Sequence, residues 1–192
     1  MDYILRSARF LASDIRKSTI RPGDSVIDAT LGNGHDTLEL CQLVGPDGHV
    51  YGFDVQPSAV ESTRARLMQA QMEGRFELYC EGHEHMGEHG FPPVSYICFN
   101  LGWLPGGDKG ITTFWETTRK ALEEALTLLK PMGVCTVCAY PGHEEGDRER
   151  RELIAFLSSL PPQRFNVLRQ HFLNAGPGAP ECFVIQKQSG TL

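Results

Sequence analysis

Residues 28–37 and the aspartate at position 54 have the types and spacing expected of a nucleoside-binding site. The first segment contains Asp28, Gly32, Asn33, Gly34 and Asp36. Glycines between a strand and a helix let a ligand approach the backbone closely. Asp54 follows the next predicted strand, where a carboxylate can accept hydrogen bonds from both hydroxyls of a ribose. The two segments together predict a nucleoside site, although Asp54 could instead cap the helix that follows it.

The spacing of the glycines favours S-adenosylmethionine over a dinucleotide. A dinucleotide fingerprint requires a third glycine, and Thr37 occupies that position. The loop also lacks the lysine of a phosphate-binding loop. Asp28 and Asp36 suit a cationic sulfonium, and we expect both near the methionine moiety. A nicotinamide-dependent dehydrogenase is the alternative that the same sheet would allow.

A second candidate element, residues 100–105, follows the fourth predicted strand. The amide oxygen of Asn100 and the backbone carbonyl of Leu101 can both accept hydrogen bonds from an amine, and Trp103 offers a flat face for a base. The element is similar to the Asn-Pro-Pro-Tyr element of amino-directed methyltransferases. It predicts an exocyclic amine as methyl acceptor. The alternative is a structural turn with a tryptophan in the core.

The histidines give less specific signals. His85 and His89 are four residues apart, but glycines interrupt their segment and no cysteine pair completes a zinc set. We therefore predict no metal and assign His83 to the cofactor site. His143, after the fifth predicted strand, could accept a proton, bind a phosphate or cap the next helix.

The elements that must position these residues alternate along the chain. Strands are predicted at 25–29, 49–54, 76–80, 94–100, 134–140, 165–173 and 182–187. Helices are predicted at about 4–15, 36–43, 57–74, 112–130 and 153–160. Thr112 or Thr113 is the predicted cap of the fourth helix. No helix separates the last two strands, so they form a hairpin. The predicted fold is α/β, a doubly wound, mostly parallel seven-stranded sheet with an antiparallel last strand.

Composition restricts the class of protein. The chain has 192 residues, of which 41% are hydrophobic, without repeat or linker, so we predict a single domain over residues 1–192. No apolar run is long enough for a membrane span, and the charged N-terminus is unlike a signal peptide. Six scattered cysteines indicate reduced thiols and a cytoplasmic protein. The net charge of −6 argues against a broad basic surface for duplex nucleic acid, and the charged run 147–151 is interpreted as a solvated helix face.

Four segments resemble the YtqB/MnmM family, which has long carried the label of rRNA methylase. They are residues 28–37, 52–56, 100–109 and 140–143. Their order is that of the family, and the resemblance covers nearly the whole chain. The resemblance implies a class I methyltransferase that uses S-adenosylmethionine to methylate 5-aminomethyl-2-thiouridine at the wobble position of tRNA, giving 5-methylaminomethyl-2-thiouridine.

The resemblance also implies roles for individual residues. By resemblance, the cofactor site would include Asn33, Asp36, Asp54, Gln56 and His83, and the residue patterns above add Asp28, Gly32, Gly34 and Asn100. By resemblance, the side facing the tRNA anticodon stem-loop would include Asn100, Lys109, Tyr140 and His143, and the element 100–105 adds Leu101 and Trp103. Asp108 and His143 are the candidate bases, and a homodimer is the assembly to test. Methylation of rRNA or of a small amine, and RNA binding without catalysis, are the alternatives.

Overall fold

The computed structural model describes residues 7–104, 106–107 and 110–190. Its strands are β1 (Ser25–Asp28), β2 (His49–Phe53), β3 (Phe76–Tyr79), β4 (Val94–Leu101), β5 (Leu129–Ala139), β6 (Phe165–Gln170) and β7 (Glu181–Lys187). Its helices are α1 (Ala8–Thr19), α2 (His35–Val44), α3 (Pro57–Gln69), α4 (Trp115–Leu128), α5 (Glu144–Ser158) and the 3-10 segment η1 (His83–His89). Ile4 and Leu5, predicted for the first helix, lie outside the described residues.

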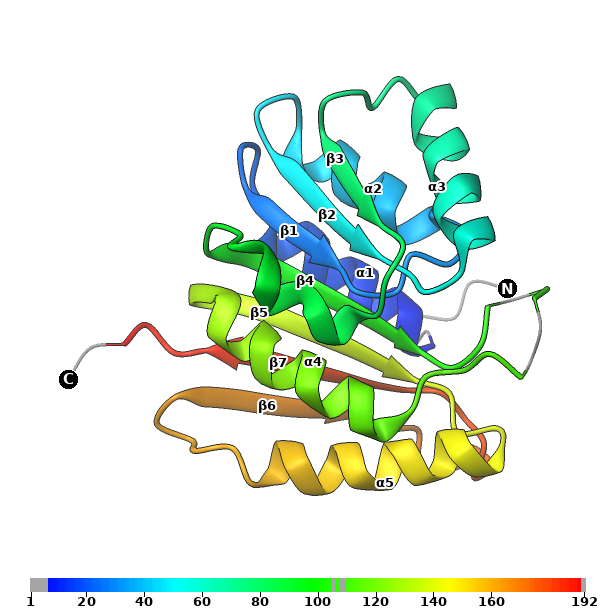
Figure 1. The fold of residues 1–192 in the computed structure, drawn as a ribbon. Helices are drawn as coiled ribbons and strands as arrows, with labels where there is room; N and C mark the ends of the chain where they lie inside the picture. The colour runs from blue at the N-terminus through cyan, green and yellow to red at the C-terminus, as the bar shows by residue number, and fades with distance from the viewer. Residues whose placement is uncertain (1–6, 105, 108–109, 191–192) are drawn as a thin grey trace.

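Within the described residues, the seven strands form one sheet in the order β3-β2-β1-β4-β5-β7-β6 (Figure 1). β7 is antiparallel to β5 and to β6, whereas the pairs among β1 to β5 are parallel. The predicted doubly wound sheet with a reversed last strand is therefore confirmed. The parallel strands end at one edge of the sheet, which is where loops from distant parts of the sequence meet.

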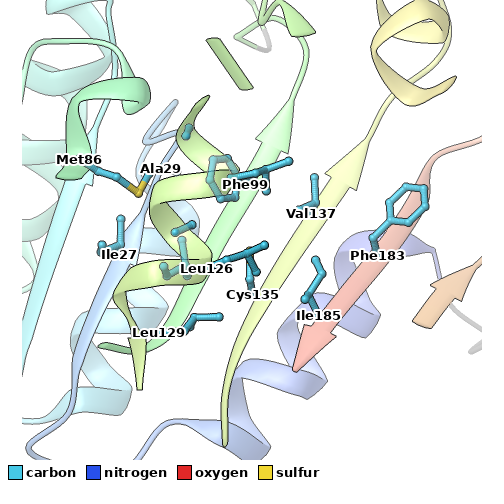
Figure 2. Packing of buried hydrophobic residues seen from close by; sticks show 14 of the residues in the cluster. Ile27, Ala29, Met86, Phe99, Leu126, Leu129, Cys135, Val137, Phe183 and Ile185 are labelled. Carbon is cyan, nitrogen blue, oxygen red and sulfur yellow. The ribbon is translucent and has the colours of Figure 1, made fainter. Parts of the chain in front are cut away.

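Helices cover both faces of the sheet because side chains of the central strands alternate between two cores (Figure 1). One core lies under α4, α5 and η1 and contains Phe99 and Cys135 (Figure 2). The other lies under α1, α2 and α3 and contains Cys98 and Cys138. Cys135 and Cys138 thus face opposite sides of the sheet, as the strand period predicts, and all six cysteines are free.

The elements differ from the sequence prediction around α4. Phe114 is the N-terminal cap, in place of Thr112 or Thr113, because the Thr113 hydroxyl is engaged by another helix. β5 begins at Leu129 and includes Pro131, whereas the prediction began the strand at residue 134. The register with β4 shifts in this stretch, and an irregular pairing tolerates a proline that donates no hydrogen bond.

Two further boundaries are shorter than predicted. α3 ends at Gln69, ahead of residue 74, because Gln71 adopts a left-handed conformation with φ +58° that a helix cannot contain. β6 ends at Gln170, ahead of residue 173. In the described part of the chain, no helix combines the length and apolar character needed to cross a bilayer.

Candidate functional site

A cavity of about 670 Å³ opens at the carboxyl ends of β1, β2, β4 and β5. Its lining includes these predicted site residues: Gly32, Asn33, Asp36, Asp54, Gln56, His83, Asn100, Leu101, Trp103, Tyr140 and His143. Asp28 and Gly34 are not among the lining residues, and Pro105, Asp108 and Lys109 lie outside the described residues. The structure thus gathers most of the predicted site, from five separate loops, around one cavity.

Asp54 joins the glycine loop to the end of β2. Its Oδ2 accepts the N–H of Gly32 and its Oδ1 accepts the N–H of Gln56, each at 2.9 Å. Gly32 has φ +52°, a conformation that favours glycine. Each oxygen of an ionised carboxylate has two lone pairs, so Asp54 can accept one further hydrogen bond at each oxygen. This geometry suits a vicinal diol, such as that of a ribose.

Gly34 serves packing between α2 and α3. It caps α2 with φ +73°, and a Cβ there would lie 2.8 Å from Oγ1 of Thr63. Thr63 donates to the carbonyl of Gly32 at 3.2 Å, and Arg66 donates to the carbonyl of Asn33 at 2.7 Å. α3 therefore holds the outer side of the loop, and the position of Gly34 does not fit the predicted direct contact with a ligand.

Asp28, which the sequence predicted near the ligand, does not line the cavity either. Its side chain is fully buried beneath the loop, where Oδ2 accepts the hydroxyl hydrogen of Thr37 at 2.7 Å and Oδ1 accepts the N–H of Thr30 at 3.2 Å. Thr37 fills the position where a dinucleotide site would have its third glycine. Asp28 therefore orders the loop from below and does not line the cavity.

The burial of Asp28 has a consequence for stability. Burial, and then the charge of Asp36, raise the pKa of Asp28 from 3.8 to about 6, against the hydrogen bonds from Thr37 and Thr30. Between these values the folded protein binds more protons than the unfolded chain, so the free energy of unfolding falls as the pH rises. At about 1.4 kcal/mol per pKa unit, the contribution lost is about 2–3 kcal/mol.

Asp28→Asn is expected to remove this part of the pH dependence. Urea unfolding of both proteins, at intervals from about pH 4 to about pH 7, measures the effect, because titration of other carboxylates cancels in the difference. The stability of the wild type should decrease relative to that of the variant over this range. Parallel stability curves for the two proteins would contradict the raised pKa.

Asp36 orients the side chain of Asn100. Nδ2 of Asn100 donates to Oδ2 of Asp36 at 3.0 Å, and the backbone N–H of Asn100 donates to Oγ1 of Thr30 at 2.7 Å. Because the amide nitrogen faces the carboxylate, the amide oxygen remains an acceptor without a partner among the described residues. Asn100 thus presents the acceptor that the sequence predicted for an amine.

Asp36 is itself held in the charged state. Burial alone would raise its pKa, but the hydrogen bond and charge of Arg16, with the hydrogen bond from Asn100, outweigh burial and lower the pKa below its usual range. The guanidinium of Arg16 lies 3.0 Å from Oδ2 of Asp36. A fixed negative charge therefore stands at the floor of the cavity, next to Asn100.

His83 contributes a neutral imidazole. Its Nδ1–H donates to the carbonyl of Ala29 at 3.2 Å, and its ring packs edge-on against Phe99. Burial lowers the pKa of His83, against the charges of Glu84 and Asp54 and the bond to Ala29. With Nδ1 protonated, the lone pair on Nε2 can accept a hydrogen bond from a ligand, consistent with the predicted role.

The loop after β4 returns to its own start. Trp103 and Thr112 form an isolated antiparallel bridge, and the N–H of Thr113 donates to the carbonyl of Gly102 at 3.2 Å. Oγ1 of Thr113 accepts the N–H of Gly102 at 2.9 Å and donates to Oε2 of Glu149 at 2.7 Å. The described ends of this loop are therefore fixed to α5 through a carboxylate.

His143 caps α5, which is one of the three roles considered for it. Its Nδ1 accepts the N–H of Gly146 at 3.2 Å, and its ring lies 4.3 Å from that of Trp103, centroid to centroid. The lone pair of Nδ1 is therefore engaged by α5, and Nε2 is buried without a hydrogen-bond partner among the described residues. A proton taken up at Nδ1 would break the cap of α5, which disfavours the predicted role of base. Tyr140, which is 36% exposed, lies at the same end of β5.

Sequence reasoning missed two charged residues that support the site. Arg16 is 1% exposed and Glu149, interpreted as part of a solvated face, is 2% exposed. Each continues a buried helical stripe: Arg16 lies four residues after Ala12, and Glu149 lies four residues before Leu153. A charge at the spacing of the apolar positions was the available signal.

The charges around the cavity favour a cationic ligand over a pyrophosphate. Carboxylates of Asp36, Asp54, Glu81 and Glu84 line it, whereas Arg9 is the one lysine or arginine among the described lining residues. Pyrophosphate sites instead use backbone N–H groups and cations. A nucleoside with a sulfonium group therefore fits the diol acceptor at Asp54 and the acidic floor at Asp36.

The histidine-rich segment forms hydrogen bonds between imidazoles and carboxylates. His89 lies 2.6 Å from a carboxylate oxygen of Glu81, and His85 lies 2.9 Å from one of Glu88. Among the described residues there is no group of three or more histidine, cysteine or acidic side chains that could hold a metal ion. The absence of a metal stays a prediction, which metal analysis of untagged protein tests.

Comparisons with known proteins agree with this site. The family model described as "Putative rRNA methylase" matches residues 50–186. A chloroplastic tRNA (mnm(5)s(2)U34)-methyltransferase of Arabidopsis thaliana is 39% identical over 187 residues, which cover 91% of this chain and 67% of that protein.

Two solved structures extend the comparison. A protein of Clostridium thermocellum described as a "putative rRNA-methylase" has a TM-score of 0.94 and 37% identity, covering 96% of this chain and all of that one. A protein of Streptococcus mutans described as a "putative methyltransferase", in complex with SAH, has a TM-score of 0.87 and 29% identity, covering 96% of this chain and 99% of that one. The fold, the site and the extent of these matches agree with the resemblance seen in the sequence, and this chain belongs to the rRNA methylase family.

Proposed function

We propose that this chain transfers the methyl group of S-adenosylmethionine to the aminomethyl nitrogen of 5-aminomethyl-2-thiouridine at the wobble position of tRNA. The product is 5-methylaminomethyl-2-thiouridine. The relative in Arabidopsis thaliana is named as a methyltransferase for this tRNA position. The similar structure from Streptococcus mutans is a complex with SAH, the demethylated form of the cofactor.

The orientation of the Asn100 amide carries the proposal. Its nitrogen is engaged by Asp36 at 3.0 Å, which leaves the oxygen to accept a hydrogen bond. Leu101 lines the same cavity, and its backbone carbonyl is proposed as the second acceptor for the two N–H bonds of a primary amine. Asp54 lines this cavity as well. An acceptor for an amine and an acceptor for a ribose in one cavity suit N-methylation by a nucleoside cofactor.

The residues of the chain would act mainly by positioning. When bound, S-adenosylmethionine supplies a methyl group on a positively charged sulfur that departs as a neutral thioether. The acceptor amine must be uncharged, because a protonated nitrogen has no lone pair. Asn100 and Leu101 would hold both N–H bonds and thereby direct the lone pair. Orientation of this kind contributes about 7–11 kcal/mol to lowering a barrier.

A base that takes up a proton from the amine would be either His143 or Asp108. The Nδ1 atom of His143 accepts from Gly146 at 3.2 Å, so a proton-accepting role for His143 requires breaking the cap of α5. Asp108, which the sequence also indicates, is the candidate to test by substitution. Because the departing thioether is neutral, no acid is needed to assist it.

We further propose the anticodon stem-loop as the part of the tRNA that is bound, with Trp103, Tyr140, His143 and Lys109 facing it.

A homodimer is proposed on the exposed apolar side chains of the edge strand β6, Val167 and Leu168, and light scattering tests it. A cytoplasmic location is proposed on the six free cysteines, and fractionation of cells tests it.

Methylation assays with defined RNA test the proposed function. Purified protein and methyl-labelled cofactor are incubated with tRNA that carries or lacks the aminomethyl group, and with ribosomal RNA. We expect label only in the tRNA that carries the group, and nucleoside mass spectrometry should identify 5-methylaminomethyl-2-thiouridine. Label in tRNA without the aminomethyl group, or in ribosomal RNA alone, would refute the proposed substrate.

A further inference from the structure

Arg16 is a buried cation that the mechanism above does not use. It comes from α1, and its side chain is 1% exposed, although arginine is almost never buried without partners. One guanidinium nitrogen lies 3.0 Å from Oδ2 of Asp36, and another lies 3.1 Å from Oε2 of Glu39. α1 is not part of the sheet, but the guanidinium of its Arg16 lies next to Asp36 of the cavity lining.

Asp36 connects Arg16 to the proposed amine acceptor. The same oxygen, Oδ2, accepts from Asn100 Nδ2 at 3.0 Å and faces Arg16 at 3.0 Å. A side-chain amide has two orientations related by a half-turn, and they differ in whether oxygen or nitrogen faces a neighbour. An ionised carboxylate at this position accepts only from the nitrogen. The state and position of Asp36 therefore decide which amide atom of Asn100 is available to a substrate.

Arg16 keeps Asp36 in the required state and position. The side chain of Asp36 is 32% exposed and lines the cavity, so without the guanidinium of Arg16 its carboxylate would turn toward the solvent in the cavity. This movement would release Asn100, because the amide nitrogen would lose its charged acceptor. Two nearby cations do not replace Arg16. Lys17 is 55% exposed and lies 3.0 Å from Glu39, and the charge of Arg9 lowers the pKa of Asp36 less than Arg16 does.

We propose that Arg16 is a positioning residue for methyl transfer, which holds Asp36 so that Asn100 keeps its amide oxygen available to the acceptor amine. The consequence for catalysis rests on the proposed function, whereas the consequence for the Asn100 amide does not. α1 is thereby part of the site, although α1 contributes only Arg9 to the cavity lining among the described residues.

Selective ¹⁵N labelling of asparagine tests the geometry without substrate or cofactor. The chain has the asparagines Asn33, Asn100, Asn166 and Asn174, so few side-chain amide signals occur. The signal of Asn100 is assigned by its loss in Asn100→Ser. We expect slow hydrogen exchange at this amide in the wild type and in the matched control Lys17→Met, and fast exchange in Arg16→Met and Arg16→Lys.

Kinetics test the consequence for the reaction. Arg16→Met is expected to lower kcat about 10²-fold, the effect of a misplaced catalytic contact. Arg16→Lys should recover part of this loss and remain about tenfold below the wild type, because an ammonium cannot replace the two-pronged guanidinium. Affinity for the cofactor should change less than kcat in both variants, and Lys17→Met should match the wild type.

The outcomes separate this inference from the proposed function. Wild-type exchange at Asn100 and wild-type kcat in a folded Arg16 variant would overturn the positioning role; if Arg16→Met does not fold, Arg16→Lys decides. The positioning role would also be overturned if an Arg16 variant lost cofactor affinity by the same factor as kcat and had a lower melting temperature, because such a result indicates a structural ion pair. If no RNA is methylated but the Asn100 amide loses its protection in the variants, the proposed function fails while the positioning of Asn100 stands.

Discussion

Asn100→Ala is expected to lower kcat by about 10²-fold or more while leaving cofactor binding nearly unchanged. The variant removes the amide oxygen that would accept from the amine, and it removes the N–H donor to Asp36 at 3.0 Å. Loss of a preorganised contact at a reacting atom typically costs about 10²–10³-fold in kcat. Asp54, at the other side of the loop, remains to hold the cofactor. Single-turnover methylation and calorimetry with S-adenosylmethionine measure the two effects separately.

Cys98→Ser is the matched control for Asn100→Ala. Cys98 lies two residues earlier on the same strand and therefore on the same face, but it is 2% exposed and belongs to the core under α1 and α2. Burial, and then the charge of Asp28, raise the pKa of this thiol well above its usual value, which disfavours a nucleophilic role. The control should keep most of its activity. Loss of activity in Cys98→Ser, with Asn100→Ala still active, would indicate a different chemistry.

Asp54→Ala is expected to weaken binding of S-adenosylmethionine by about 3 kcal/mol, or about 10²-fold in Kd, because hydrogen bonds to a charged group contribute about 1.5–3 kcal/mol each. Two ribose hydroxyls would lose their acceptor. The N–H groups of Gly32 and Gln56, each now 2.9 Å from this carboxylate, would lose theirs as well, so the loop would be less ordered. Isothermal titration calorimetry measures the change in Kd.

Asp47→Ala serves as the control for Asp54→Ala. Asp47 is an exposed residue in the turn before β2, so the substitution removes the same charge at the opposite end of the same strand. Its Kd should equal that of the wild type. Equal weakening in both variants would attribute the effect to net charge, and an unchanged Kd in folded Asp54→Ala would remove Asp54 from the cofactor site.

Much of the site could be predicted because parallel strands place their carboxyl ends together. The glycine loop, Asp54 and Asn100 each follow a strand that the apolar pattern identifies, so strand order alone brings them to one edge of the sheet. The reversed last strand likewise follows from the missing helix between β6 and β7. These features depend only on local sequence patterns and on the order of the elements along the chain, and both can be obtained from the sequence.

The sequence by itself determined the fold class, the edge of the sheet at which the candidate site lies and the residue types that meet there. Only the tertiary structure decided the roles of Asp28, His143, Arg16 and Glu149: a buried carboxylate beneath the loop, a helix cap, and two buried charges that hold other residues in place. The physical reason is that a polar side chain is stable in the interior only with a partner. That partner comes from a distant segment, as Asp36 does for Arg16, so neighbouring residues do not indicate it.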